Sequence, residues 1–143
     1  MRGLESYVRQ CELEASLLEL ARLRASQING CAYCVDMHTK DARAAGETEQ
    51  RLYAVCVWEE TPFFTERERA ALAWTEAVTL EGESRVPDAV YELARRNFTE
   101  KELVDLTLAL IAINGWNRLA ISFRSVAGSY MPPGNRAAGE ATA

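Results

Sequence analysis

Apolar residues recur at intervals of three and four along most of this chain, and this spacing constrains the fold more than any other feature. The clearest example is the stretch 12–26, with Leu13, Leu17, Leu20 and Ala21. Such spacing places apolar side chains on one face of a helix. Sustained alternation of apolar and polar residues, the mark of a strand, is missing from the sequence. The sequence therefore predicts an all-α protein.

Helix start and stop signals divide the chain. Asn29-Gly30 and Gly46 favour helix ends, because these residue types tolerate left-handed backbone. Thr65 with Glu68, and Thr99 with Glu102, have the spacing of capping boxes that begin helices. The expected helices cover about 12–26, 31–45, 48–57, 66–79, 87–96 and 100–125. We predict a single-domain bundle of about six to seven helices.

The length of 143 residues suits one domain, which can bury a core without a disulfide or metal. We assign residues 1–127 to the helical domain. The tail 128–143 is rich in proline and glycine, and we expect it to be disordered.

Charge and hydropathy exclude several classes of protein. A net charge of −5 argues against a nucleic-acid-binding protein. Residues 1–10 lack the apolar stretch of a signal peptide, and the longest nearly apolar run, 106–113, is too short to cross a membrane. We expect a cytoplasmic protein, with no nucleic acid or membrane as partner. In that compartment a close cysteine pair is typically redox-active or metal-binding.

One group of residues carries chemistry. Cys31 and Cys34 are three residues apart, and His38, the only histidine, follows four residues later. On a helix the three lie on one face, whereas Asp36 and Lys40, together with Asp41 and Arg43, are expected to point elsewhere.

Three effects act on these thiols. The start of a helix favours a thiolate, and an imidazole one turn away can take the thiol proton. A second thiol can trap the oxidised first one as a disulfide. A thiolate that attacks a peroxide would therefore complete a cycle with an external dithiol and no bound cofactor.

Two other interpretations stay open. Cys34 and His38 could be inert core residues, because cysteine is often buried. Alternatively, Cys31, Cys34 and His38 could bind zinc with Cys56 or Cys11 as the fourth ligand. We interpret Cys11 and Cys56 themselves as inert core cysteines.

The stretch 23–38, LRASQINGCAYCVDMH, closely resembles the carboxymuconolactone decarboxylase superfamily, in its alkylhydroperoxidase D-like branch. Matches continue through Ala42-Arg43, Gly46-Glu47, the stretch 64–72 and Ile113–Arg118. The resemblance covers roughly residues 12–126.

This resemblance implies an all-helical homo-oligomer (a dimer, trimer or hexamer) with thiol peroxidase activity. It implies that Cys34 attacks a hydroperoxide, that Cys31 resolves the product, and that His38 relays the proton with help from Glu19. The implied reductant is a dithiol on a lipoyl- or thioredoxin-like protein. One departure is Tyr33, which occupies a position where some members have a second histidine.

From the residues alone, Glu19 could equally form a surface ion pair with Arg22. Its small or apolar helical neighbours make burial of this face plausible. Gly115, Trp116 and Asn117 could line a pocket or an interface, although a tryptophan such as Trp116 more often lies in the core.

Two competing functions remain at this stage. A lactone decarboxylase or isomerase, as in the other branch of the superfamily, would use proton transfer and would not need two cysteines. A non-catalytic redox sensor would use the disulfide as a switch.

Overall fold

The computed structural model describes residues 1–133, and within them every regular element is a helix. The elements are α1 (Arg2–Val8), α2 (Ala15–Asn29), α3 (Ala32–Ala44), α4 (Glu49–Ala54), the 3₁₀ helix η1 (Val55–Glu60), α5 (Glu66–Thr79), α6 (Glu81–Ser84), α7 (Asp88–Asn97) and α8 (Glu100–Ser122). The prediction of an all-α fold is confirmed. The described chain has more helices than expected. Two of those that were not predicted, α1 and α6, are short and have no side-chain cap, so the sequence contains no signal for them.

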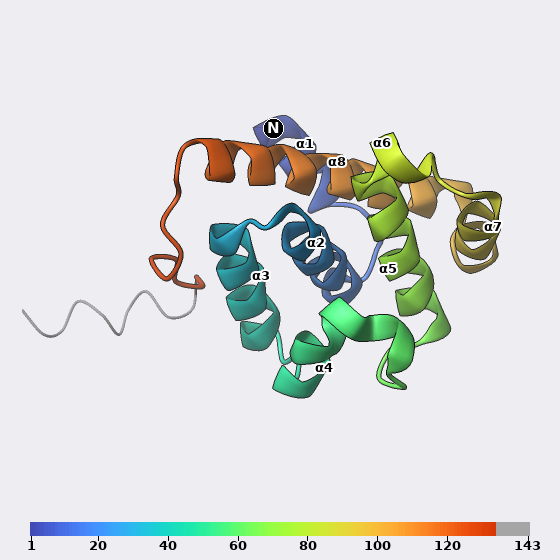
Figure 1. Cartoon of the computed structure of the whole chain (residues 1–143), viewed down its shortest axis with the longest axis horizontal. Helices are drawn as coiled ribbons and strands as arrows, with labels where there is room; N and C mark the ends of the chain where they lie inside the picture. Colours follow the sequence, from blue (N-terminus) through green and yellow to red (C-terminus); the bar gives the residue numbers. More distant parts are fainter. Residues whose placement is uncertain (134–143) are drawn as a thin grey trace, which may run out of the picture.

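Helix α2 lies at the centre of the molecule (Figure 1). It packs against α3 and α5 on its flanks and against α8, which crosses the whole bundle. Helix α1 packs on α8, and α7 packs on α5. Segments from both ends of the chain therefore meet around α2.

The pattern of buried residues on α2 explains this central place. Leu17, Leu18 and Ala21 belong to the apolar cluster shared with α8 and α5. Leu20 and Leu23 belong to a second cluster, shared with α4, η1 and α5. A helix with two apolar faces buries both only when it has neighbours on both sides.

The helix boundaries follow the capping signals closely. Thr65–Glu68 and Thr99–Glu102 form complete capping boxes at the starts of α5 and α8. The expected helix 48–57 is wrong in part: α4 ends at Ala54, and the chain continues as a 3₁₀ helix with non-helical backbone at Val57.

After α8 the chain turns back and runs along α3 (Figure 1). The Gly128 N–H donates to Asp36 Oδ2 at 3.0 Å, and Lys40 Nζ donates to the Tyr130 carbonyl at 3.0 Å. The Tyr130 hydroxyl donates to Asp41 Oδ1 at 2.8 Å. Three hydrogen bonds thus join residues 128–130 to α3. Residues 134–143 of the expected disordered tail 128–143 lie outside the described residues.

None of the helices within residues 1–133 is long and apolar enough to cross a membrane.

Candidate active site

The loop between α2 and α3 places the cysteine pair. Gly30 caps α2 with φ +69°, a left-handed conformation that glycine adopts without strain. The N–H groups of Gly30 and Cys31 donate back to the carbonyls of Gln27 and Ser26. This turn ends α2 within one residue and makes Cys31 the N-cap of α3.

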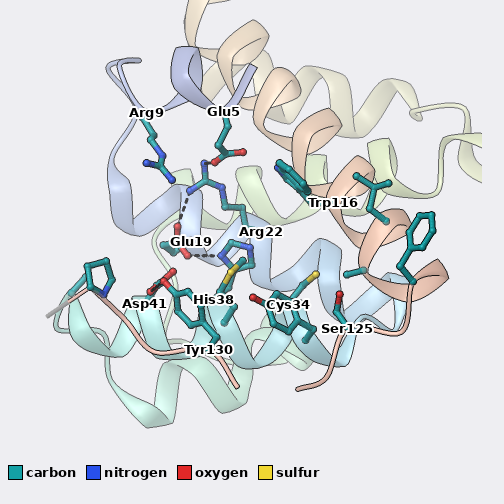
Figure 2. Close-up of a pocket in the computed structure, with 17 residues that line it drawn as sticks. Glu5, Arg9, Glu19, Arg22, Cys34, His38, Asp41, Trp116, Ser125 and Tyr130 are labelled. Carbon is teal, nitrogen blue, oxygen red and sulfur yellow. Dashed lines mark hydrogen bonds and ion pairs between the residues drawn. The ribbon is translucent and has the colours of Figure 1, made fainter. Parts of the chain in front are cut away.

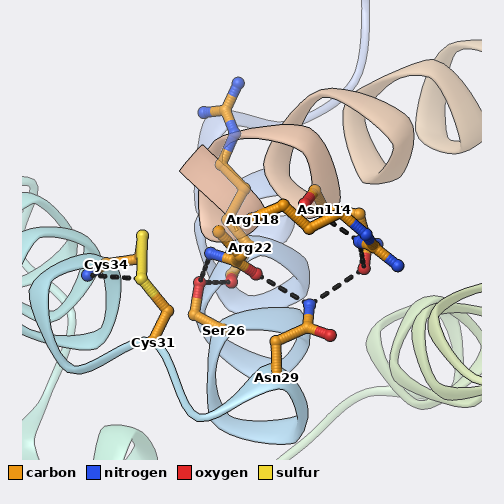
Figure 3. The surroundings of a disulfide bond; sticks show 8 residues. Arg22, Ser26, Asn29, Cys31, Cys34, Asn114 and Arg118 are labelled. Carbon is orange, nitrogen blue, oxygen red and sulfur yellow. Dashed lines mark hydrogen bonds between the residues drawn. A yellow bond between two sulfur atoms is a disulfide. The ribbon is translucent and has the colours of Figure 1, made fainter. Parts of the chain in front are cut away.

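Cys31 and Cys34 lie in the first turn of α3 and are joined as a disulfide (Figure 3). Their Cα atoms are 5.3 Å apart, a usual span for a disulfide. The Cys34 N–H also donates to Cys31 Sγ at 3.4 Å. Both residues are only 1% exposed. The sulfur pair lies at the start of a helix, a position that favours a thiolate when the disulfide is reduced.

His38 follows one helical turn after Cys34 and is buried, with 6% exposure. Its Nδ1 lies 2.8 Å from Glu19 Oε2, across the interface between α3 and α2. Its other ring nitrogen, Nε2, is also buried and has no hydrogen-bond partner among residues 1–133. A buried ring nitrogen without a partner is costly unless a group in the site uses it.

Glu19 has two partners, one for each carboxylate oxygen. Oε2 meets His38, and Oε1 accepts a hydrogen bond from Arg22 Nη1 at 2.7 Å. Burial alone would raise the pKa of Glu19, but the hydrogen bonds and positive charge of His38 and Arg22 outweigh it, so the pKa lies below its ordinary value. Glu19 is therefore ionised at neutral pH, and Nδ1 of His38 must carry the proton in this pair. With the proton on Nδ1, Nε2 is the ring nitrogen that faces the site and that exchanges a second proton.

These groups lie against a cavity of about 960 Å³ (Figure 2). Cys34, His38 and Glu19 line it, whereas Cys31 does not. Helix α8 supplies an apolar wall to the same cavity, and the segment after it adds further residues. The remaining lining residues are Glu5, Arg9, Arg22, Tyr33, Met37, Asp41, Ala45, Trp116, Leu119, Ala120, Phe123, Ser125, Tyr130 and Pro133.

The structure brings together the four residues singled out from the sequence: Cys31, Cys34, His38 and Glu19. The surface ion pair considered for Glu19 and the contact implied by the family are both present, because the carboxylate divides between Arg22 and His38. 

The structure also places the residues that the sequence left between core, pocket and interface. Tyr33 and Trp116 are half-buried in the cavity wall, while Asn117 is fully buried behind it.

The sequence predicted that the Asp41 side chain points away from the site, and this prediction is wrong. Asp41 lines the cavity, and its carboxylate lies within 4.8 Å of ligand atoms on Glu19 and His38. The spacing contained the signal, because Asp41 follows His38 by three residues and Cys34 by seven. Arg9 and Glu5 carried no such signal, since α1 reaches the cavity only through tertiary packing.

The cysteine-based zinc site gains no support. Glu19, His38 and Asp41 are the one group of three potential ligands that residues 1–133 bring together, and no cysteine belongs to it. Cys11 is half-buried and packs against the core, as expected in part. The expectation that Cys56 is a core residue is wrong: it is exposed, on the kinked 3₁₀ helix, where its thiol donates to the Tyr53 carbonyl.

A buried polar network lies behind the disulfide and joins α2 to α8 (Figure 3). Asn29 Nδ2 donates to Asn117 Oδ1 at 2.8 Å and to Asn114 Oδ1 at 2.9 Å. Asn117 Nδ2 in turn donates to Ser26 Oγ at 3.1 Å. The network fixes the last turn of α2, and through Gly30 it fixes the position of Cys31.

The fold and site define a helical protein with a buried cysteine pair beside a carboxylate–imidazole pair and a large cavity. The model of the carboxymuconolactone decarboxylase family matches residues 1–77, more than half of the chain. The chain belongs to this family, in its alkylhydroperoxidase D-like branch.

Relatives agree with this placement. A protein of Bacillus subtilis described as uncharacterized, YdfG, is 44% identical over 90% of this chain and 88% of its own length. A solved structure from Agrobacterium tumefaciens, of a protein of unknown function for which a role as the antioxidant defence protein AhpD is suggested, is 46% identical over 90% of this chain and 88% of that chain, with a TM-score of 0.87. The debrominase Bmp8 has the same fold, with a TM-score of 0.78 at 22% identity over 89% of this chain and 68% of that chain.

Proposed function

We propose that this protein is a thiol-dependent peroxidase that reduces hydroperoxides through Cys34, with Cys31 as the resolving thiol. One observation carries the proposal: Cys34, but not Cys31, lines a cavity that it shares with a buried His38 whose Nε2 is unpartnered among residues 1–133. The Agrobacterium relative, at 46% identity and described in terms of antioxidant defence, supports the same activity.

The reduced enzyme begins with a proton transfer. Nε2 of His38 takes the Cys34 thiol proton, and Glu19 stabilises the imidazolium through its 2.8 Å contact with Nδ1. The thiolate is further stabilised by the helix start, where a thiol pKa falls from about 8.5 toward neutrality. General-base assistance of this kind typically contributes about 10²–10⁴-fold to a rate.

The Cys34 thiolate then attacks the terminal oxygen of the hydroperoxide. A sulfur–oxygen bond forms, the oxygen–oxygen bond breaks, and the alkoxide leaves. The alkoxide takes the proton from Nε2 of His38 and departs as an alcohol. Sulfur is oxidised to a sulfenic acid and the peroxide is reduced, so protons and electrons balance.

Cys31 completes the half-cycle. Its thiol condenses with the Cys34 sulfenic acid, forming the disulfide and releasing one water. An external dithiol then reduces the disulfide by exchange and leaves as its own disulfide. The cycle uses no bound cofactor, and its reductant is a dithiol of the lipoyl or thioredoxin kind.

Two alternatives are less well supported. A lactone decarboxylase or isomerase could use His38 and Glu19 but would leave the buried cysteine pair without a role. A redox sensor could use the pair but would not need a cavity of about 960 Å³ against one of its sulfurs.

Steady-state consumption of tert-butyl hydroperoxide with dihydrolipoamide as donor tests the proposal. We expect Cys34→Ser to abolish turnover and sulfenic acid trapping by dimedone. Cys31→Ser should lose turnover with the dithiol but still form the trapped adduct on Cys34. Cys56→Ser, a matched control at an exposed cysteine, should behave as wild type. Full turnover in Cys34→Ser would refute the proposal, and oxidation of wild type without turnover would indicate a sensor.

A further inference from the structure

The cavity next to Cys34 is much larger than a peroxide group requires. Its volume of about 960 Å³ is at the upper end of the range that holds drug-sized organic ligands. A hydroperoxide that fills it must therefore carry a sizeable body. The chemistry of the cavity walls indicates what that body is.

One wall is apolar and comes from a single face of α8. Trp116, Leu119 and Phe123 follow one another at helical spacing and all line the cavity. Leu119 is 43% exposed and Phe123 is 79% exposed, so neither is covered by the protein core. An apolar ligand body along this wall would remove that surface from water, which favours binding.

Charged side chains gather at the other end of the cavity, next to α1 (Figure 2). Arg22 forms two ion pairs there, with Nη2 at 2.9 Å from Glu5 and Nη1 at 2.7 Å from Glu19. Its charge is therefore neutralised by two carboxylates and is not available to a ligand. Glu5 is occupied by the same contact.

Arg9 differs from Arg22. Glu5 lies on α1 and Arg9 is the C-cap of that helix, four residues later, a spacing at which a glutamate and an arginine can pair. Glu5 instead pairs with Arg22, and the Arg9 side chain has no hydrogen bond or ion pair among residues 1–133. Arg9 thus lines the cavity as a cation that has no counter-ion in the described part of the chain. The other carboxylate of the cavity outside these contacts, Asp41, accepts a hydrogen bond from Tyr130.

We propose that the cavity selects amphipathic hydroperoxides that carry a carboxylate, with the apolar body along Trp116, Leu119 and Phe123 and the carboxylate at Arg9. This substrate class rests on the peroxidase function proposed above. A guanidinium can hold a carboxylate with two parallel hydrogen bonds. Because Arg9 is exposed, we expect the charge to contribute about 3- to 10-fold to kcat/KM.

Kinetics with a matched substrate pair tests this selection. The probes are a fatty acid hydroperoxide and its methyl ester, both below their aggregation concentration, and the readout is the ratio of their kcat/KM values. Wild type should prefer the acid by about 3- to 10-fold. Arg9→Gln should bring the ratio close to one, and Arg9→Lys should keep most of it. Arg2→Gln, an exposed arginine of the same helix outside the cavity, should keep the wild-type ratio.

A binding experiment separates this inference from the peroxidase function. Decanoate and decanol, which cannot react, are titrated into oxidised wild type and Arg9→Gln by calorimetry. Tighter binding of decanoate to wild type that Arg9→Gln removes supports the carboxylate site, even if no hydroperoxide is turned over. A wild-type ratio of one, or equal binding of decanoate by both proteins, would overturn the inference while leaving peroxidase activity untouched.

Discussion

Glu19 Oε2 lies 2.8 Å from His38 Nδ1, although the two residues are on different helices and 19 positions apart in the chain. The contact joins the most buried helix of the bundle to the helix that carries the cysteines. It fixes the ring orientation and the tautomer of His38, and the contacts with His38 and then Arg22 hold the pKa of the Glu19 carboxyl below its ordinary value.

The first prediction concerns this carboxylate. Glu19→Gln keeps a hydrogen-bond acceptor for Nδ1 but removes the charge that stabilises the imidazolium. We expect kcat/KM for tert-butyl hydroperoxide to fall by about 10- to 100-fold. Glu12→Gln, an exposed glutamate just before α2, is the control and should retain wild-type kinetics. Equal rates in the two variants would exclude a role for the Glu19 charge.

A second prediction concerns pH and stability. Burial raises the pKa of Glu68, but its hydrogen bonds with Arg51 and Thr65 lower it more, so the folded value lies below the ordinary 4.5. An unfolded chain then binds more protons than the folded one at acidic pH. The stabilisation is therefore present above pH 4.5 and is lost as the pH falls through the lower folded pKa.

We expect the urea-unfolding free energy of wild type to decline on acidification from pH 5 to pH 3, as the pH falls below the ordinary glutamate pKa of 4.5. Glu68→Gln should start less stable at pH 6 and decline less steeply. Glu66→Gln, exposed in the same first turn of α5, should follow the wild-type slope. Parallel slopes for wild type and Glu68→Gln would contradict the assignment.

The third prediction concerns the turn before the cysteines. Gly30 has φ +69°, so Gly30→Ala introduces a side chain into left-handed backbone and should destabilise the fold by about 1–2 kcal/mol. Gly3→Ala, in open space on α1, should be neutral or stabilise by up to about 1 kcal/mol. Thermal unfolding of the two variants checks this, and an unchanged Tm for Gly30→Ala would be the contrary result.

The fourth prediction concerns the buried network. Asn117 is fully buried and bonds to both Ser26 and Asn29. Asn117→Ala removes both of these buried hydrogen bonds and leaves a cavity, although Asn29 keeps its bond to Asn114 and Ser26 keeps its bond to the Arg22 carbonyl, and should cost about 2–3 kcal/mol of unfolding free energy. Ser122 is exposed on the same helix and lies outside the network, and Ser122→Ala should change stability by less than about 0.5 kcal/mol. Similar losses in both variants would mean that the network is not what stabilises the α2–α8 contact.

The sequence predicted the long helices well because their signals are local. The capping boxes at Thr65 and Thr99, and the glycine at position 30, act within four residues of themselves. Helix α1 has no such signal. It is held by tertiary contacts, such as the 2.8 Å hydrogen bond from the Tyr7 hydroxyl to Asp105, 98 residues away.

The sequence likewise predicted those parts of the site that depend on local geometry. The common face of Cys34 and His38 follows from helix geometry alone. Glu19 came only from the family resemblance, because its contact with His38 crosses two helices. The cavity walls from α1 and α8 were not predictable at all, since long-range packing alone brings Arg9 and Phe123 to the same space.

The two sulfurs share one turn of helix, with only two residues between them and Cα atoms 5.3 Å apart. Oxidation and reduction can therefore alternate on an unchanged backbone, with no segment that must unwind and rewind in each cycle. The consequence falls on the electron donor. Both cysteines are buried in the oxidised form and only Cys34 lines the cavity, so in the proposed cycle a donor thiol would reach the disulfide through that cavity. This favours a dithiol at the end of a slender arm over one embedded in a broad protein surface.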